Sequence, residues 1–324
     1  MNDTVTIADI HRAQAALVGK IERTPLAASD SLSTGAPVFL KLEHLQTTGS
    51  FKLRGATNAV ARLDDAQRAG GVVGVSTGNH GRGLAHAAKQ AGIRCIICMS
   101  SLVPENKVEG IRALGAEVRI VGESQDDAQF EVEQLVDEEG MTMLPPFDHA
   151  DVIAGQGTLG LEIVEDLPAV ATVIVPLSGG GLIAGVARAV KATNPAARVI
   201  GVTMERGAAM YVSRRAGKPV QVAERPSLAD ALGGGIGLDN RYTFAMTNDL
   251  VDDIVLLSEA EIAAAIRHAY NEEKQVIEGS GAVGIGVLLA GHVEAKGPTA
   301  IVLSGGNIDK DLHARVIAGA DGVE

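Results

Sequence analysis

Short apolar runs alternate with longer amphipathic stretches along most of the chain. Continuous apolar runs separated by helical patterns are typical of parallel strands joined by crossover helices. In the first half of the chain this rhythm predicts strands over 71–75, 94–99, 117–121 and 142–144. The helices predicted between them cover 81–92, 104–115 and 124–140.

The same rhythm returns in the second half of the chain. It predicts strands over 172–176, 197–203 and 299–304, with helices ending near residue 193 and covering 258–274. The two series predict an α/β protein with two sheets. We expect a small domain, residues 71–146, inserted into a large domain formed by 1–70 and 147–324. A cleft between the two domains is the expected ligand site.

Composition places the chain among ordinary globular proteins. Of its 324 residues, 46% are hydrophobic and 21% are charged, which suits a packed core. Lys and Arg total 28 against 40 Asp and Glu, for a net charge of -12, and this argues against nucleic acid as a partner. The sequence shows no membrane span and no export signal. We therefore expect a cytoplasmic protein, and the two cysteines suit a reducing compartment.

The first candidate for chemistry is a lysine that follows small polar residues. The segment 47–56 has the sequence TTGSFKLRGA, with Lys52 just before a predicted helix that runs to about residue 63. A desolvated lysine near polar donors has a lowered pKa and becomes a nucleophile toward carbonyl groups. Taken alone, the segment does not exclude the common alternative, in which Lys52 and Arg54 are surface charges on a helix.

Three further candidate segments follow predicted strands. They are STGNHG at 76–81, SGGGLIAG at 178–185 and LSGGN at 303–307. Backbone N–H groups at a helix N-terminus bind anions, and consecutive glycines leave such groups bare for a phosphate. Open α/β sheets bind ligands at the carboxyl ends of their strands. Two alternatives remain: an ordinary capped turn at 76–81, and a nicotinamide site at 178–185 with Glu205 after the next strand.

Together these motifs resemble the pyridoxal-phosphate enzymes of fold type II, in the serine/threonine dehydratase and serine racemase branch. The matching residues are SFK at 50–52, STGNH at 76–80, VIAGQGT at 152–158, GGGL at 179–182 and SGGN at 304–307. The resemblance covers nearly the whole chain in order. It implies a two-domain, tryptophan synthase β-like fold with two open, parallel-rich sheets and flanking helices. It also implies a homodimer.

The resemblance further implies a role for each motif residue. Lys52 would hold pyridoxal 5′-phosphate as a Schiff base and then move the proton at Cα. Asn79 would contact the ring O3′ and Ser304 the pyridine nitrogen, where a hydroxyl favours loss of a β-leaving group. The residues implied for phosphate binding are Gly179, Gly180, Gly181 and Leu182. Those implied for the substrate carboxylate are Ser76, Thr77, Asn79 and His80.

Two features depart from that branch. Thr77 stands where serine racemases carry a serine as acid/base and simple dehydratases an alanine, so racemase activity is neither supported nor excluded. The divalent-metal site of the branch would fall on Glu205, Ala209 and Tyr211. One carboxylate and one backbone carbonyl make a poor site for a hard cation. We therefore expect no metal there.

Two other patterns have structural interpretations. Cys95 and Cys98 have redox spacing but lie in a predicted apolar strand, which favours two buried core cysteines. Ser124 followed by Asp127 matches a helix capping box. The alternative is that Asp126 or Asp127 faces the cleft, where either would favour a substrate with a cationic side chain over an anionic one.

The resemblance implies a lyase that removes water and ammonia from a small β-hydroxy amino acid. L-serine or L-threonine is the generic substrate. A hydroxyectoine-derived 3-hydroxy-2,4-diamino acid and 3-hydroxyaspartate are further candidates. The alternatives are an amino-acid racemase, a pyridoxal-phosphate-dependent β-replacement enzyme, and a regulatory protein that binds the cofactor without chemistry.

Overall fold

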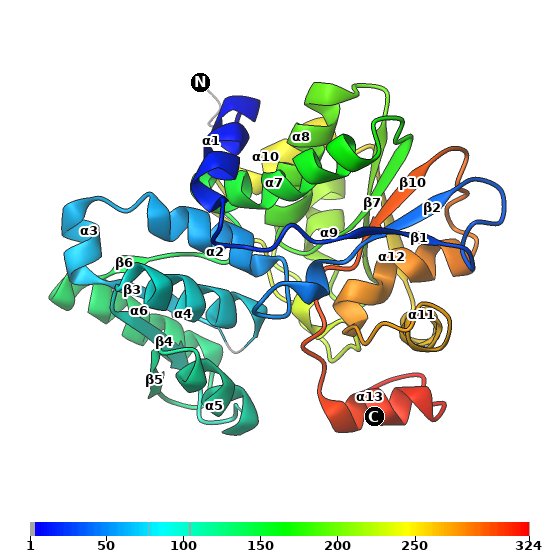
Figure 1. Cartoon of the computed structure of the whole chain (residues 1–324). Helices are drawn as coiled ribbons and strands as arrows, with labels where there is room; N and C mark the ends of the chain where they lie inside the picture. Colours follow the sequence, from blue (N-terminus) through cyan, green and yellow to red (C-terminus); the bar gives the residue numbers. More distant parts are fainter. Residues whose placement is uncertain (1–3, 77, 104, 324) are drawn as a thin grey trace.

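The chain forms two lobes, each built on its own sheet and joined through helix α2 (Figure 1). The computed structural model describes residues 4–76, 78–103 and 105–323, without the side chains of Asn106, Gln125 and Asp126. Two parallel-rich sheets with flanking helices confirm the predicted fold class. None of the helices in the described ranges is long and apolar enough to cross a membrane.

The larger sheet brings together strands from both ends of the chain. Its order is β1 (Leu26–Ser29), β2 (Val38–Lys41), β10 (Thr299–Val302), β7 (Thr172–Pro176), β8 (Arg198–Met204) and β9 (Asp253–Leu257). Only β1 runs antiparallel to its neighbour. Every residue of β7 and β10 is buried, because helices cover both faces of the sheet. The last strand, β10, therefore lies in the interior beside β2.

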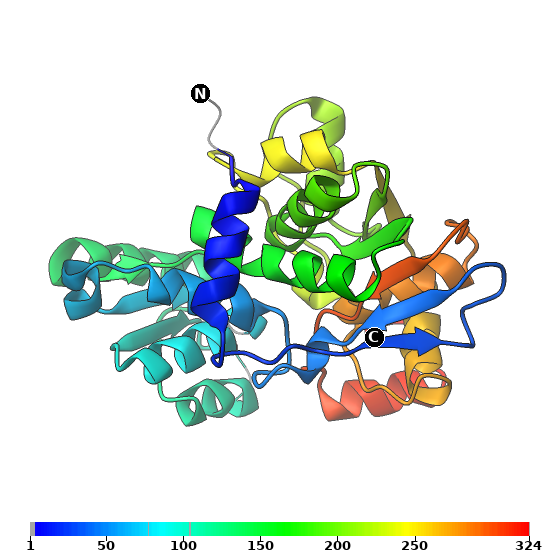
Figure 2. The ribbon, with the colours of Figure 1, turned by 45° about the horizontal axis from the view of Figure 1, so that its top comes forward.

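Helices cover the larger sheet on two sides. One side carries α7 (Ala150–Asp166), α8 (Gly181–Thr193), α9 (Ala209–Ala216) and α10 (Thr243–Leu250). The other carries α11 (Glu259–Asn271), α12 (Gly279–Leu289) and α13 (Lys310–Ile317). Helix α1 (Ile7–Leu17) lies across the junction of the lobes and packs on α7 and α2 (Figure 2). The α8 N-terminus follows β7 at the carboxyl edge of the sheet.

The smaller sheet is fully parallel. Its order is β5 (Glu117–Ile120), β4 (Cys95–Met99), β3 (Val72–Val75) and β6 (Thr142–Met143). One face packs against α4 (Asn79–Ala91) and α5 (Glu105–Ala113), and the other against α6 (Gln125–Glu139). These strands lie within the range 71–146 predicted for the small domain. The boundaries of that domain stay a proposal, because α2 (Lys52–Ala61) packs on both α4 and α7, and α3 (Asp65–Gly70) follows it.

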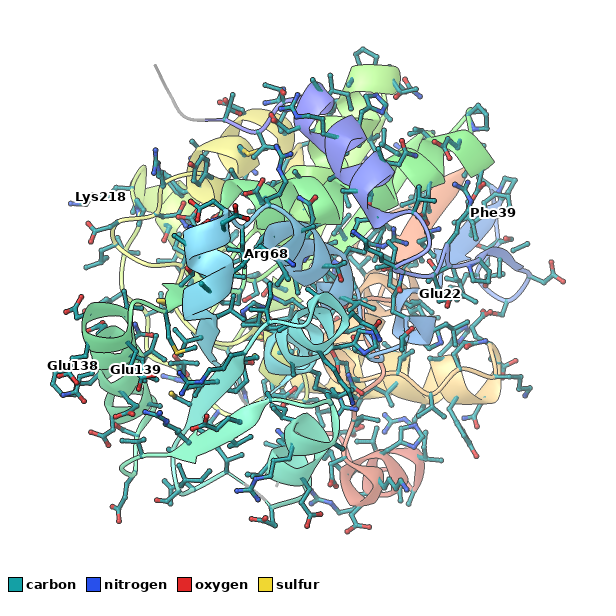
Figure 3. All side chains as sticks on the ribbon, turned by 60° about the vertical axis from the view of Figure 1, so that its left-hand side comes forward. Glu22, Phe39, Arg68, Glu138, Glu139 and Lys218 are labelled. Atoms are coloured by element: carbon teal, nitrogen blue, oxygen red, sulfur yellow. The ribbon has the colours of Figure 1, made fainter. Side chains whose placement is uncertain are left out.

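Two of the structural interpretations can be compared with the structure. Cys95 and Cys98 are buried in β4, and burial raises the pKa of the Cys95 thiol to about 12, which confirms two core cysteines. Asp127 accepts the N–H groups of Glu123 and Ser124, both at 3.0 Å. It completes the capping box of α6 on an exposed surface. At the other end of α6, Glu138 and Glu139 are also on the outside (Figure 3).

Candidate active site

Lys52 is positioned by a junction between its own loop and the end of β10. Ser50 pairs with Gly305 in an isolated antiparallel bridge. The Phe51 N–H donates to the Ser304 carbonyl at 3.0 Å. The Gly306 N–H donates to the Gly49 carbonyl at 2.9 Å. The lysine motif and the Ser304–Asn307 motif, which stand at opposite ends of the chain, therefore form one structural unit.

A cavity of about 320 Å³ opens in front of this junction, between the carboxyl edge of the larger sheet and the N-terminus of α4. Its volume suits a small-molecule site. Its lining contains every predicted site residue that the structure describes: Lys52, Ser76, Asn79, His80, Gly179, Gly180, Gly181, Leu182 and Ser304. Thr77 lies outside the described residues, and its predicted role stays a prediction.

The Lys52 amine faces this cavity. Its Nζ donates to the Pro146 carbonyl at 2.7 Å and lies 5.3 Å from the centre of the Phe51 ring. Burial lowers the pKa of Lys52 to about 8, while the negative charge of Glu278 acts in the opposite direction. At a pH near this pKa, a large fraction of the Lys52 amine is therefore unprotonated, as a nucleophile toward an aldehyde must be.

The glycine segment connects β7 to the first turn of α8. Gly180 caps α8 in the left-handed region, at a φ of 91°, where glycine is strongly favoured. At Gly179 an added Cβ would lie 2.4 Å from the ring of Phe147. The first N–H groups of a helix have no partner within it and carry partial positive charge. Those of α8 begin at the cavity wall and suit a phosphate.

Asn79 is held in one orientation by two partners. Its Nδ2 donates to Glu278 Oε1 at 2.7 Å, and its Oδ1 accepts from Asn307 Nδ2 at 2.6 Å. Asn307 Nδ2 also donates to the Thr48 carbonyl at 2.9 Å. Burial raises the pKa of Glu278 to about 7, and the charge of Asp230 acts in the same direction. An amide has two N–H groups, so the Asn79 side chain keeps one for a ligand.

The geometry limits what Ser76 and His80 can donate to a substrate. His80 Nε2 donates to the Leu144 carbonyl at 2.8 Å. Burial lowers the pKa of His80 to about 3, so the neutral ring has no second N–H. Its backbone N–H is the donor that remains. Ser76 Oγ accepts from the N–H of Gly81 at 3.0 Å, which leaves its hydroxyl proton to donate.

Four charged residues of the cavity were not singled out from the sequence. They are Arg82 on α4, Lys107 on α5, Asp230 before Gly233, and Glu278 before α12. They stand in no local motif, and only folding brings them to the cavity. Asp127, the acid weighed as a cleft residue, lies outside the lining. The capping interpretation of Asp127 is correct, and the side chain of Asp126 lies outside the described residues.

The position where related enzymes would bind a metal, at Glu205, Ala209 and Tyr211, has few groups that could bind a cation. Glu205 is exposed, and its backbone N–H donates to the Leu257 carbonyl at 2.9 Å. Within the described ranges, no group of three or more His, Cys, Asp or Glu side chains is placed to hold a metal ion. The expectation that Glu205, Ala209 and Tyr211 bind no metal stays a prediction.

The cavity residues fit a phosphorylated aldehyde with a polar ring. The amine of Lys52 suits the aldehyde, and the first turn of α8 suits the phosphate. Ser280 also lines the cavity, and its buried Oγ has no hydrogen-bond partner among the described residues. A buried hydroxyl without a partner is unfavourable unless a ligand supplies one. These features match the requirements of pyridoxal phosphate.

A lysine that shares a cavity with a glycine segment suited to a phosphate, between two α/β lobes, is typical of a cofactor-dependent enzyme of the pyridoxal-phosphate type. Residues 18–305 match the family described as "Pyridoxal-phosphate dependent enzyme". The chain belongs to that family, and pyridoxal phosphate is its cofactor.

Similar proteins and structures narrow the class further. The chain is 62% identical to a "Putative threonine dehydratase" of Sinorhizobium fredii, over 97% of this chain and 96% of that protein. It is 43% identical to an "L-threonine ammonia-lyase" of Thermotoga maritima, over 97% and 78% of the two chains. The structure of maize serine racemase matches with a TM-score of 0.91 at 34% identity, over 97% of each chain. The chain is a pyridoxal-phosphate-dependent lyase of the amino acid ammonia-lyase type.

Proposed function

We propose that the chain converts a β-hydroxy amino acid of the L-threonine or L-serine type into a 2-oxo acid and ammonium. The observation that carries the proposal is the amine of Lys52, with its pKa lowered to about 8, in a cavity it shares with Ser304 and the glycine segment. The relatives named threonine dehydratase and L-threonine ammonia-lyase support the same reaction.

Each cavity wall has a separate task in this proposal. The first turn of α8 binds the phosphate of the cofactor, and Asn79 donates its free N–H to the ring oxygen. The N-terminus of α4 binds the substrate carboxylate through the Ser76 hydroxyl and the His80 backbone N–H. The helix dipole of α4 favours an anion at the same place. The substrate is thereby held with its Cα toward Lys52.

Lys52 is the group that moves the proton at Cα. When bound, pyridoxal phosphate withdraws electrons from Cα and makes that proton acidic. The Lys52 amine is suited to accept it because its pKa lies near the working pH. The hydroxyl at Cβ would leave with a proton as water, and one water would be consumed when the enamine product hydrolyses to the 2-oxo acid and ammonium. The net products are a 2-oxo acid and ammonium.

Ser304 favours elimination over other outcomes. It is 3% exposed and its side chain lines the cavity. With the cofactor bound, Ser304 would offer its pyridine nitrogen a neutral hydroxyl in place of a carboxylate. A hydroxyl would favour the protonated ring less, so the cofactor would withdraw electrons more weakly and loss of the β-hydroxyl would compete better with return of the proton.

The test is product formation by the cofactor-loaded enzyme from L-threonine, L-serine and L-alanine. We expect equal amounts of 2-oxo acid and ammonium from the two hydroxy amino acids and none from alanine, which has no β-leaving group. Ammonium release from alanine would point to other chemistry. The absence of products from every β-hydroxy amino acid would contradict the proposal.

A second candidate function is amino-acid racemisation, which the match to maize serine racemase favours. Racemisation needs a proton donor on the face of the substrate opposite Lys52. Thr77 is the candidate by its place in the STGNH motif. Incubation of L-serine with the enzyme, followed by chiral separation, measures D-serine directly. A Thr77→Ala variant that keeps elimination and loses D-serine would assign that role to Thr77.

Two wider expectations follow from the family resemblance. We propose residues 71–146 as a small domain inserted into the large one, and a homodimer as the assembly. Limited proteolysis tests the boundaries near Gly71 and Pro146. Light scattering tests the assembly, and a mass equal to one chain would contradict the homodimer.

A further inference from the structure

The cavity has two cations on one wall that the proposed reaction does not use. Arg82 lies on α4 three residues beyond Asn79, a spacing that places both on one side of the helix. Lys107 lies on α5, which packs beside α4. Both residues line the cavity and are partly buried.

The two cations lie close together. A Cβ added to Gly110 would be 2.8 Å from Arg82 Nη1, so the guanidinium rests against the backbone of α5. Gly110 stands three residues after Lys107, one helical turn along α5. The Arg82 guanidinium therefore lies one helical turn along α5 from Lys107, and both residues line the same cavity.

Neither cation has an acid within hydrogen-bond distance among the described residues, although the charges of Lys107 and Glu278 attract each other at longer range. Neither Arg82 nor Lys107 forms a hydrogen bond or ion pair through its side chain with the described residues, and Arg82 Nε is buried without a partner. Glu278 is engaged with Asn79, and Asp230 accepts the N–H of Ala231 at 2.8 Å. A buried donor without a partner and two adjacent cations are both stabilised by an anionic ligand.

We propose that Arg82 and Lys107 bind a second anionic group of the substrate, beyond its α-carboxylate. The cavity already assigns the cofactor phosphate to α8 and the α-carboxylate to the N-terminus of α4. Serine and threonine have no further anion. The substrate class that supplies one is a 2-amino-3-hydroxy acid with a terminal carboxylate, as in 3-hydroxyaspartate. This inference rests on the proposed function and specifies its substrate.

Arg82 and Lys107 would favour a substrate with an anionic side chain, the opposite of the preference expected from Asp126 or Asp127. Asp127 caps α6 outside the cavity lining. Besides Lys52, the charged side chains of the cavity are Arg82, Lys107, the exposed Asp230, which accepts the N–H of Ala231, and Glu278, which accepts from Asn79. A diamino acid with a cationic side chain would meet repulsion from Arg82 and Lys107. Of substrates with an anionic, a neutral or a cationic side chain, the cationic one is expected to be the poorest.

The experiment compares ligands that differ in charge on the cofactor-loaded enzyme. Binding is measured first with L-aspartate and L-asparagine, which are nearly equal in size and have no β-hydroxyl to lose. The dissociation constants come from the change in cofactor absorbance. We expect aspartate to bind at least tenfold more tightly than asparagine, and this ratio to fall as salt screens the charges.

Variants assign the preference to the two residues. Arg82→Gln and Lys107→Gln should each lower the aspartate-to-asparagine ratio, and the double variant should bring it near one. Lys89→Gln is the matched control, since Lys89 lies on α4 but is exposed and outside the cavity lining. It should leave the ratio unchanged. The kcat/KM for 3-hydroxyaspartate relative to threonine should fall in parallel with the binding ratio.

Two results would overturn the inference. One is a wild-type enzyme that binds asparagine as tightly as aspartate. The other is an equal loss for both ligands in Arg82→Gln, which would point to an ion pair with Asp230 across the cavity mouth. Failure of the proposed function has a different signature: no hydroxy amino acid would release ammonium, whatever the binding ratio.

Discussion

Replacing Arg54 with methionine should strongly destabilise the protein, because Arg54 is the centre of a buried charge cluster. Its guanidinium donates to Glu43 Oε1 and Oε2, both at 2.8 Å, and to Glu162 Oε1 at 2.7 Å. The Arg54 and Glu43 side chains are both 0% exposed. The fourth member, Lys41, donates to Glu162 Oε2 at 2.6 Å. Two cations and two carboxylates therefore balance in charge.

The magnitude follows from what the substitution leaves behind. Methionine fills similar space but donates nothing, so Glu43 stays buried with Thr24 as its remaining side-chain donor among the described residues. Breaking one partner of a buried pair costs about 3–5 kcal/mol, against a total stability of about 5–15 kcal/mol for a typical domain. The variant should fold but unfold at a much lower urea concentration. Because Arg54 stands on α2 near Lys52, cofactor binding should weaken as well.

The assay is urea unfolding of wild type, Arg54→Met and Arg94→Met. Arg94 pairs with Glu139 at 2.6 Å, but both side chains are well exposed, 47% and 38%, and Glu139 lies on the outer side of the small lobe (Figure 3). An exposed pair contributes about 0–1 kcal/mol. The reasoning is refuted if Arg54→Met costs no more than Arg94→Met.

Two further predictions concern the cavity walls. Gly180→Ala should lower the free energy of unfolding by roughly 2–4 kcal/mol, because its φ of 91° is strained for alanine and the new Cβ would lie 3.0 Å from Thr243 Cβ. Urea unfolding of the cofactor-free variant checks this, and an unchanged midpoint would contradict it. Glu278→Gln should flatten the pH dependence of stability. The folded pKa of Glu278 is raised from 4.5 to about 7, so the wild type loses stability as pH rises between those values. Equal slopes for both proteins between pH 5 and 7.5, a window of about two and a half pH units, would show that Glu278 does not titrate there.

Much of the fold was predictable because its strands and helices repeat one pattern. The strands β3 to β5 and the helices between them lie within a few residues of their predicted ranges. Helix α12 was missed because Ala282, Val283, Ile285 and Val287 are all buried. A helix that is buried all round has no polar face, so the usual period is absent. The strands β1 and β2 were missed because they pair antiparallel with no helix between them, and so stand outside the alternation of strands and helices.

The candidate site, like the fold, has some residues that a local sequence pattern predicts and others that it does not. The lysine, the glycine segment and the small polar strand ends are local patterns, and the structure places all of those it describes around one cavity. Glu278, Arg82 and Lys107 reach the cavity from α12, α4 and α5 without a common motif. Their roles depend on which partners lie within hydrogen-bond distance, and the order of residues along the chain does not contain that information.

The most direct test of the account is to locate the cofactor on the chain. Reduction of the cofactor-loaded enzyme with borohydride fixes the link between cofactor and lysine, and peptide mass spectrometry then identifies the modified residue. The account predicts that the added mass falls on Lys52, and that Lys52→Ala loses both the visible absorbance of the bound cofactor and ammonium release. Modification of another lysine, such as Lys107, or full activity in Lys52→Ala would contradict it.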